Sequence, residues 1–366
     1  MILFRYIFGR VAFVFVATFA TILLLIVMMD LVEHLRRGGS REGITGALVA
    51  MAILHAPSIS MKTVPFVMLL SGMWAYMQLA RSSELVAARA AGHTYWAAAR
   101  AGMTAAAVIG LLITAFYGPL ASTALNVYDR LEAKYLDGAG GLFSATSEGL
   151  WLRESREDGQ TVIRASRTNA EGTELRDVTF LMFGPGDSLL ERVDAQRALL
   201  LDGAWALDDV ITHRIQYGRD AEPPAPERAE TAQVPTRLTA TEIQNSFAAP
   251  ESISFWKLPA AIAGMEQAGF SARRHRSYLH SMIALPFFLA GMTLIAAAFA
   301  IRPPRSAKFG WIALICSLTG FALYFLGDVS MALGASGAAP AELGAWAPVI
   351  AAGLFGIALS LYFGEA

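Results

Sequence analysis

The sequence predicts an α-helical polytopic membrane protein of six transmembrane helices, with an all-β domain of jelly-roll type inserted between the third and the fourth. Of the 366 residues, 55% are hydrophobic and only 16% are charged, whereas soluble domains carry about 25% charged residues. Several apolar runs are long enough to cross a bilayer, which takes about 20 residues. Residues 142–246 show short apolar segments and frequent turns instead.

The composition argues against nucleic-acid binding and against catalysis. The net charge is −1, so the chain lacks the basic excess of nucleic-acid-binding domains. It contains no Gly-Lys pair, hence no P-loop, and no H-E-x-x-H, C-x-x-C or G-x-S-x-G motif. The six histidines are dispersed, and the single cysteine, Cys316, lies in an apolar run. We therefore expect no catalytic residue, metal site or cofactor.

Six apolar segments are expected to form the membrane spans. The first is too long for a signal-peptide core and no small-residue cleavage site follows it, so it is expected to be retained. The second is too long for one straight crossing, and Pro57 and Pro65 are expected to kink it. The expected spans are residues 11–31, 44–80, 95–120, 278–300, 309–326 and 346–363.

A short polar stretch, residues 79–92 (LARSSELVAARAAG), separates the second and third spans. A serine, Ser82 or Ser83, can cap a helix here. Glu84 falls in the first turn, where the helix dipole favours a negative charge, and Gly92 suits the position after the last turn. We expect a short helix at a membrane face. It is either a plain connector between two spans or a coupling helix, which docks into a cytoplasmic ATPase.

The stretch between the third and fourth spans has the pattern of an autonomous β domain. Asp158-Gly159 and Asp202-Gly203 are hairpin signals between apolar runs. Regular short strands with frequent turns favour a sandwich or jelly roll over a parallel sheet. The candidate strands are residues 150–152, 161–163, 178–183 and 198–201.

These patterns divide the chain into four parts. Residues 1–140 hold the first three spans and the short helix, which is expected over residues 82–92. Residues 141–248 form the β domain. Residues 249–277 form a hinge or helix that leads back to the membrane, and residues 278–366 hold the last three spans.

With six spans, both termini share one side of the membrane. The basic N-terminus and the tight basic connector at residues 302–308 favour that side as cytoplasmic. Two interpretations of the basic residues on the opposite face remain open. They form a cationic rim for an anionic headgroup or substrate, or they snorkel at the interface and pair with nearby carboxylates. These residues are Arg36, Arg37, Arg41, Lys62, Arg130, Lys134, Arg273, Arg274 and Arg276.

Six segments, in order along the chain, match a known family. They are residues 5–6, 33–39, 79–92, 148–151, 252–254 and 302–306. With these segments, and with a β domain between spans three and four, the chain resembles the permease subunits of the lipopolysaccharide exporter, the LptF/LptG family. The resemblance covers essentially the whole chain, and the order of the motifs is its specific feature. The segments at 148–151 and 252–254 favour the LptG branch over the LptF branch.

The resemblance implies the role and the partners of such a permease. It extracts lipopolysaccharide from the inner membrane of Gram-negative bacteria, while ATP is hydrolysed by a separate partner. It pairs with a paralogue, here an LptF-like chain, and sits on an LptB-like ATPase dimer. Its β domain is periplasmic and passes lipopolysaccharide towards an LptC-like membrane-anchored protein. Both termini and the short helix are then cytoplasmic.

The resemblance also implies a role for the short helix. In the family, the glutamate of an S-E-L segment docks the coupling helix into the ATPase. Here that segment is Ser83, Glu84 and Leu85. Arg89 and Gly92 complete the expected coupling site.

Basic residues beyond the first span and near the end of the third contact lipid phosphates or sugars in the family. The matching positions are Arg36, Arg37, Arg130 and Lys134. Asp30 departs from the pattern, because a lysine is expected there. By the helical rise of about 1.5 Å per residue, Lys62 lies near the same headgroup region, and we infer from that height that it compensates.

Besides the LptF branch, three other interpretations of the sequence are open. A lipoprotein-release or mechanotransmission permease resembles a four-span protein with its outer domain after the first span, whereas here three spans precede the domain. A membrane receptor or scaffold with a sensory β domain would make the short helix a passive loop. A membrane enzyme would need a site that the sequence does not show. Loss of ATPase coupling on changing Glu84→Arg separates a transporter from a scaffold.

Overall fold

The computed structural model forms two compact units. The helical unit comprises Met1–Glu132, Glu251–Leu258 and Arg273–Ala366, and the β unit comprises Ala133–Pro250 and Pro259–Ala272. The described residues are 2–38, 45–82, 84–135, 144–146, 149–156, 159–169, 173–184, 188–201, 203–215, 225–236, 249–267, 271–300 and 309–364.

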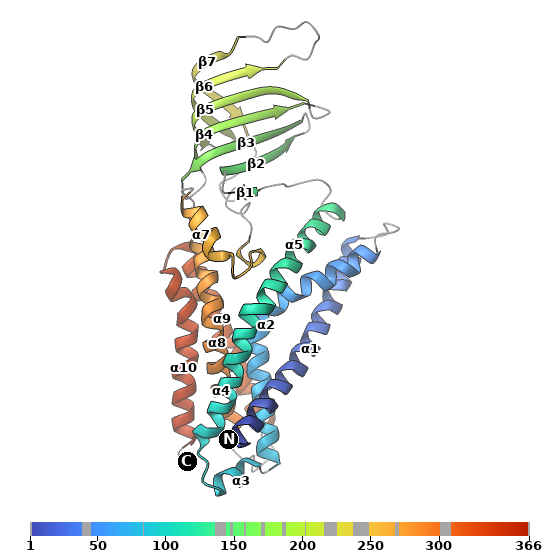
Figure 1. Ribbon diagram of the computed structural model, residues 1–366, viewed down its shortest axis with the longest axis vertical. Helices are drawn as coiled ribbons and strands as arrows, with labels where there is room; N and C mark the ends of the chain where they lie inside the picture. Colours follow the sequence, from blue (N-terminus) through green and yellow to red (C-terminus); the bar gives the residue numbers. More distant parts are fainter. Residues whose placement is uncertain are drawn as a thin grey trace. The chain divides into compact units, whose positions relative to one another are not determined.

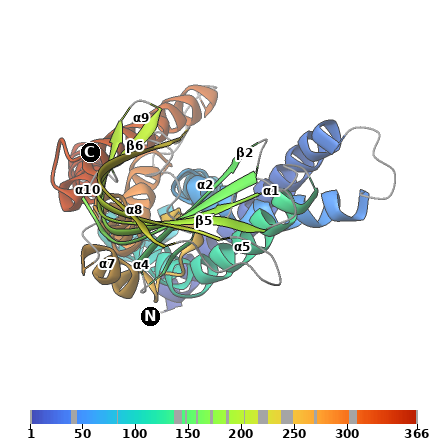
Figure 2. The same cartoon turned by 90° about the horizontal axis from the view of Figure 1, so that it is seen from above.

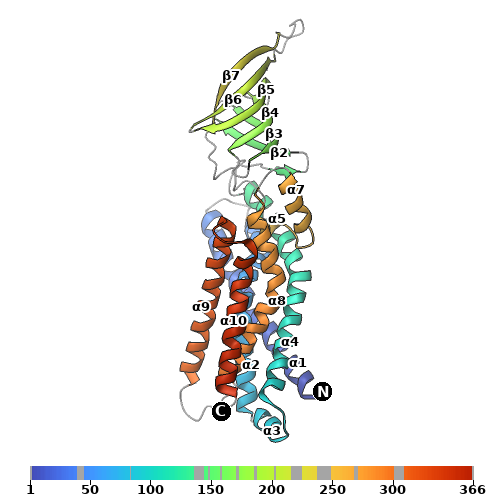
Figure 3. The ribbon, with the colours of Figure 1, turned by 90° about the vertical axis from the view of Figure 1, so that its left-hand side faces the viewer.

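Within these ranges, six helices are long and apolar enough to cross a membrane, which confirms the predicted number (Figures 1 and 3). The third is built from α4, one π-helical turn η1 and α5. Both termini and the short helix α3 (Glu84–Ala90) lie at one end of the helical unit (Figure 1). The bounds are α1 Ile2–Gly38, α2 Thr45–Arg81, α4 Tyr95–Leu112, η1 Ile113–Tyr117, α5 Gly118–Tyr135, α8 Arg273–Ala300, α9 Phe309–Ser336 and α10 Ala341–Gly364.

The helices extend beyond the apolar runs that predict them. The first apolar run ends at residue 31, but α1 continues to Gly38. Glu33 pairs there with Arg36 and Arg37, three and four residues further along. Pairs at this spacing lie on one helix face and support a polar helix end that hydropathy alone does not indicate.

The fifth span also runs further than the sequence predicts, because α9 and α10 pack closely through glycines. The expected end was residue 326, and α9 continues to Ser336. A Cβ on Gly344 of α10 would lie 3.2 Å from the Cα of Gly334 in α9. Small residues at such a crossing let two backbones approach. Gly337 follows with φ of +83° and ends the helix.

Helix α8 lies at the centre of the helical unit and contacts α2, α4, α9 and α10. Pro286 within it lacks an N–H group, which leaves the carbonyl of Met282 without its helical partner. The Thr114 hydroxyl from η1 donates a hydrogen bond to that carbonyl at 3.0 Å. A Cβ on Gly110 would lie 2.5 Å from the Cα of Pro286, so α4 crosses α8 closely at this point.

The β unit contains one antiparallel sheet whose described strands follow chain order, β1 to β7. This confirms the inserted antiparallel β domain. The connectivity is a meander, without the crossovers that link the two sheets of a jelly roll, because each strand pairs with its neighbours in sequence. The strands are β1 Ser144–Thr146, β2 Gly149–Arg156, β3 Gly159–Thr168, β4 Glu174–Phe183, β5 Leu189–Leu201, β6 Ala204–Arg214 and β7 Glu227–Pro235.

A row of positions without a regular partner crosses this sheet. In each of the four strand pairs from β3 to β7, one residue on each strand is missing from the register. The residues concerned are Ser166, Asp177, Gln196, Asp209 and Glu230. Asp177 and Asp209 have φ of 52° and 53°, a left-handed conformation that Asp tolerates better than most residues. The register of β4 and β5 also shifts between Met182 and Phe183, and the sheet is curved (Figure 2).

The β unit has its own apolar core. Phe180, Trp205 and Leu207 are fully buried there, and Met265 of helix α7 (Leu258–Gln267) packs against the same cluster. On the exposed side of β4, Arg197 contacts the Glu174 carboxylate at 3.0 Å. Arg197, together with Arg176, holds the pKa of Glu174 below its ordinary value.

Candidate functional site

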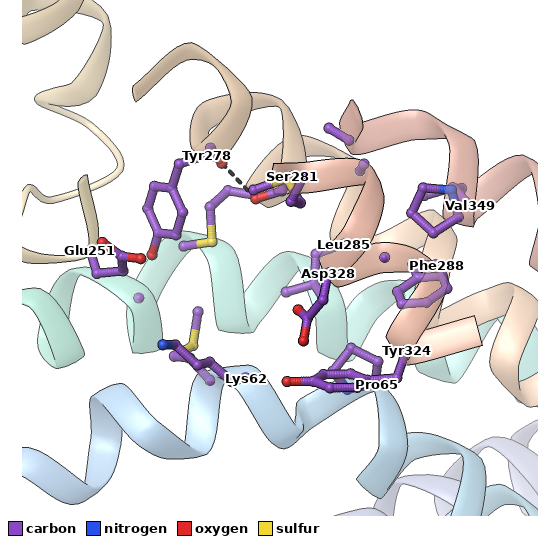
Figure 4. A pocket seen from close by; sticks show the side chains of 18 of the residues that line it. Lys62, Pro65, Glu251, Tyr278, Ser281, Leu285, Phe288, Tyr324, Asp328 and Val349 are labelled. Carbon is purple, nitrogen blue, oxygen red and sulfur yellow. Dashed lines mark hydrogen bonds between the residues drawn. The ribbon is translucent and has the colours of Figure 1, made fainter. Parts of the chain in front are cut away.

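A cavity of about 490 Å³ lies within the helical unit, between α2, α5, α8, α9 and α10 (Figure 4). Its volume falls in the range of ligand pockets, about 300–1,000 Å³. Small residues, among them Gly118, Ala121, Gly327 and Ala345, face it from three helices. Their short side chains leave the space that larger residues would fill.

The cavity is apolar at one end and polar at the other. Figure 4 shows Lys62, Glu251 and Tyr278 at one end, and Phe288 and Val349 at the other. Lys62 is exposed and forms no ion pair with any residue that the structure describes. The polar end holds a cation and the carboxylate of Glu251, and the apolar end suits a hydrocarbon chain.

Two further polar side chains come from α9. Asp328 and Tyr324 both line the cavity, and the Asp328 carboxylate lies beside the Tyr324 hydroxyl (Figure 4). The sequence prediction missed both, as it missed Glu251 and Tyr278. For Asp328 a signal existed, because an acidic residue directly after an apolar run is costly in a membrane unless it faces a cavity. The predicted end of the span at residue 326 left it outside.

A second polar group, the outer polar cluster, joins α1, α2 and α5 at the end of the helical unit away from α3. In its inner part His34 and Tyr128 are buried, and Asp30 and His55 are partly exposed. The two carboxylate oxygens of Asp30 each lie 3.1 Å from Nδ1 of His55. The buried His34 lies 3.3 Å from the Tyr128 hydroxyl through Nε2, and the His55 and Tyr128 rings stack at 4.3 Å. None of these contacts was predicted.

The outer part of the cluster contains two of the predicted headgroup residues. Arg36 and Arg37 both contact Glu33, at 2.7 and 3.0 Å, and Arg37 reaches Glu132 of α5 at 3.3 Å. Both guanidinium groups are more than half exposed. Exposed ion pairs contribute about 0–1 kcal/mol, so these pairs leave the arginines able to bind another anion.

The remaining predicted headgroup residues lie in different surroundings. Arg130 and Lys134 are exposed on α5 and pair with no carboxylate among the described residues. Lys134 lies 5.0 Å from the ring centre of Tyr135. The structure therefore brings four of the five predicted cations to the ends of α1 and α5. Lys62 is the exception, because it lies two helical turns along α2 from His55, about 10 Å by helical rise, in the cavity.

The short helix α3 is shorter than the predicted stretch. Glu84 lies in its first turn and is hydrogen-bonded to Tyr6 of α1. Leu85 is buried in the core of the helical unit and anchors α3. Ser82 does not cap α3, because its hydroxyl donates to the carbonyls of Gln78 and Leu79 at the end of α2.

The end of α3 has the predicted glycine. Gly92 has φ of +84°, and the N–H of His93 donates to the carbonyl of Ala88 at 3.0 Å. This is the hydrogen bond of a Schellman-type helix end. Of the other predicted coupling residues, Ser83 and the side chain of Arg89 lie outside the described residues.

Comparison with known proteins supplies an independent finding. The family model described as lipopolysaccharide export system permease LptF/LptG matches residues 5–362. The chain is similar to the lipopolysaccharide export system permease protein LptG of Escherichia coli K12, with 25% identity over 310 residues that make up 82% of each chain. The protein of the same description from Escherichia coli O6:H1 (strain CFT073) is similar to the same extent.

Proposed function

The chain belongs to the lipopolysaccharide export system permease family LptF/LptG, and from this premise we propose that it is the LptG-type subunit of the exporter. It is a multi-pass membrane protein with six apolar helices. The similarity to LptG of Escherichia coli K12 supports the LptG assignment over LptF. Rescue of cells depleted of LptG, but not of cells depleted of LptF, tests this assignment, and the reverse pattern overturns it.

The observation that carries the proposal is the family match over residues 5–362, and the apolar part of the cavity supports it. An acylated and phosphorylated lipid needs an apolar space for its chains and cations for its phosphates. Phe288 and Leu285 supply the first, and Lys62 supplies one cation in a lining that also holds the carboxylates of Glu251 and Asp328. The volume of about 490 Å³ holds part of such a lipid, so the rest lies outside this cavity.

The free energy of extraction must come from a partner. Each buried CH₂ group contributes about 0.8 kcal/mol to membrane anchoring, so a lipid with several acyl chains does not leave the bilayer unaided. We assign ATP hydrolysis to an LptB-like dimer that contacts α3 through Glu84. Collapse of the cavity then drives the lipid towards the β domain, residues 141–248.

The outer polar cluster and its neighbours supply the headgroup contacts in this proposal. Arg36, Arg37, Arg130 and Lys134 are exposed cations on α1 and α5. The β domain lies in the periplasm, where an LptC-like protein receives the lipid, and an LptF-like chain completes the exporter. Both termini and α3 face the cytoplasm.

Site-specific photo-crosslinking tests the cavity. A benzophenone amino acid at Phe288, which lines the cavity, is compared with one at the neighbouring Phe287, which is 58% exposed on the same helix and does not line it. In proteoliposomes with the paralogue and the ATPase, we expect lipopolysaccharide crosslinks at position 288 that decrease when ATP is added. Crosslinks at position 287 should not respond to ATP.

Charge reversal tests the cations. The double change Arg36→Glu and Arg37→Glu, and separately Lys62→Glu, should lower the crosslinks at position 288 before ATP is added, because the anionic headgroup loses its partners. Crosslinks that never appear at position 288, or that are equal at 287 and 288 with and without ATP, overturn the transport proposal. A receptor without transport is then the remaining function.

A further inference from the structure

A second hollow, the α4 groove, lies in the helical unit and shares no residue with the cavity. It has a volume of about 590 Å³. It is lined by Leu3 and Phe4 of α1, by Ala97 and Ala107 of α4 and by Ala290 of α8, among others. Three alanines at the contact of three helices leave a slot that an apolar chain can fill.

The lining residues of the groove share one face of α4. Ala97, Arg100, Thr104 and Ala107 are spaced by three or four residues, which places them in one line along the helix. From Arg100 to Ala107 the groove extends about 10 Å along the helix axis. The groove therefore has a cation near one end and small apolar residues beyond it.

The charged end of the groove attracts an anion. Arg100 is exposed, and its Nε donates a hydrogen bond to the carbonyl of Trp96 at 3.2 Å. Its terminal nitrogens have no partner among the described residues. His93 also lines this end, and no carboxylate does among the residues that the structure describes. The guanidinium is thus fixed at its base while its terminal N–H groups remain available, which suits a phosphate.

The position of the charged end matches a membrane interface. Trp96 lies in the first turn of α4 and is partly exposed, and such aromatic residues gather where a span leaves the bilayer. This is the end of the helical unit that carries α3, whereas Lys62 of the cavity lies about 30 Å further along α2 from Arg81 by helical rise. The two sites therefore face opposite leaflets.

We propose that the α4 groove binds an anionic glycerophospholipid of the leaflet on the α3 side. Its phosphate contacts Arg100, and one acyl chain lies along Ala107 and Ala290. Such a lipid seals the contact of α1, α4 and α8. The proposal depends on the membrane location of the chain and not on its role in export.

Native mass spectrometry of the detergent-solubilised full chain tests this proposal. Dioleoyl phosphatidylglycerol is compared with dioleoyl phosphatidylcholine, which has the same chains and no net charge. We expect a preference for phosphatidylglycerol that falls about tenfold in Arg100→Gln, as for the loss of one charge-assisted contact. The matched control Arg81→Gln removes an exposed guanidinium from the last turn of α2, at the same end of the helical unit and outside the groove, and should not alter the preference.

Filling the groove tests the acyl chain. Ala107→Trp should weaken binding of both lipids. If that variant does not fold, the smaller change Ala97→Leu in the same groove replaces it and should have the same effect. Equal binding of the two lipids by the wild type, or an unchanged preference in Arg100→Gln, overturns the proposal. Lipopolysaccharide that displaces phosphatidylglycerol from the wild type but not from Arg100→Gln also overturns it, because the occupant is then the exported lipid.

Discussion

Asp30 occupies a position where the family resemblance leads us to expect a lysine, and its contacts explain the difference. Its carboxylate faces Nδ1 of His55, and His34 lies one turn away at 3.4 Å. An acidic side chain near a helix end in a membrane needs such partners. Asp30 therefore joins α1 to α2, and headgroup contacts by its neighbours Arg36 and Arg37 stay a prediction. That Lys62 compensates for the missing lysine stays a prediction.

Glu84 gives the sharpest prediction at the residue scale. Changing Glu84→Arg should reduce ATP-dependent release of lipopolysaccharide about tenfold, because a charge pair across the ATPase contact becomes a repulsion. The fold should persist, since Leu85 still anchors α3. ATPase activity and lipid release are measured in proteoliposomes with the partner subunits.

A matched reversal controls for the change in net charge. Glu342 begins α10 at the other end of the helical unit and is half exposed. We expect Glu342→Arg to release lipid as the wild type does. If Glu84→Arg retains full coupling, α3 is a connector and the ATPase contact lies elsewhere.

At the scale of elements, single residues on two helices allow the helices to pack closely. Pro286 removes a helical hydrogen bond from α8, and Thr114 of η1 replaces it. The α9–α10 contact depends in the same way on Gly334 and Gly344. Thr114 and Met282 are 168 residues apart in sequence, so no local pattern predicts their contact. Gly334 and Gly344 are only ten residues apart, but they meet because the turn between α9 and α10 folds one helix back on the other.

The glycine contact between α9 and α10 can be tested directly. A Cβ on Gly344 would lie 2.7 Å from the carbonyl oxygen of Ser330, whereas nothing lies within 4 Å of one on Gly353 in the same helix. We expect Gly344→Leu to destabilise the helical unit by about 1–3 kcal/mol, the usual cost of overpacking. Gly353→Leu should have little effect. Thermal unfolding in detergent compares the two, and equal midpoints would refute the close contact.

At the scale of the whole molecule, the proposed topology predicts which residues reach which side of the membrane. Cys316 is buried, so an impermeant maleimide should leave the native chain unlabelled. In spheroplasts, Arg228→Cys in β7 should be labelled at once. Ser82→Cys, next to α3, should be labelled only after lysis. Labelling of Ser82→Cys in intact spheroplasts would contradict a cytoplasmic α3.

The sequence alone determined the number of spans, the inserted antiparallel domain and the family. Hydropathy integrates over about 20 residues and tolerates local error, and hairpin signals such as Asp202-Gly203 act over two residues, where Gly203 takes φ of +83°. It also selected Arg36, Arg37 and Glu84 from matching motifs.

Only the tertiary structure decided where helices end, which strands pair with one another, and which residues share a cavity. Asp328 and Glu251 are 77 residues apart in number and line one cavity, and α9 continues past its apolar run because a neighbouring helix packs against it. The row of unpaired positions through Asp177 and Asp209 crosses the sheet without any strong local signal. These features depend on packing between distant segments, and such contacts form only when the whole chain has folded.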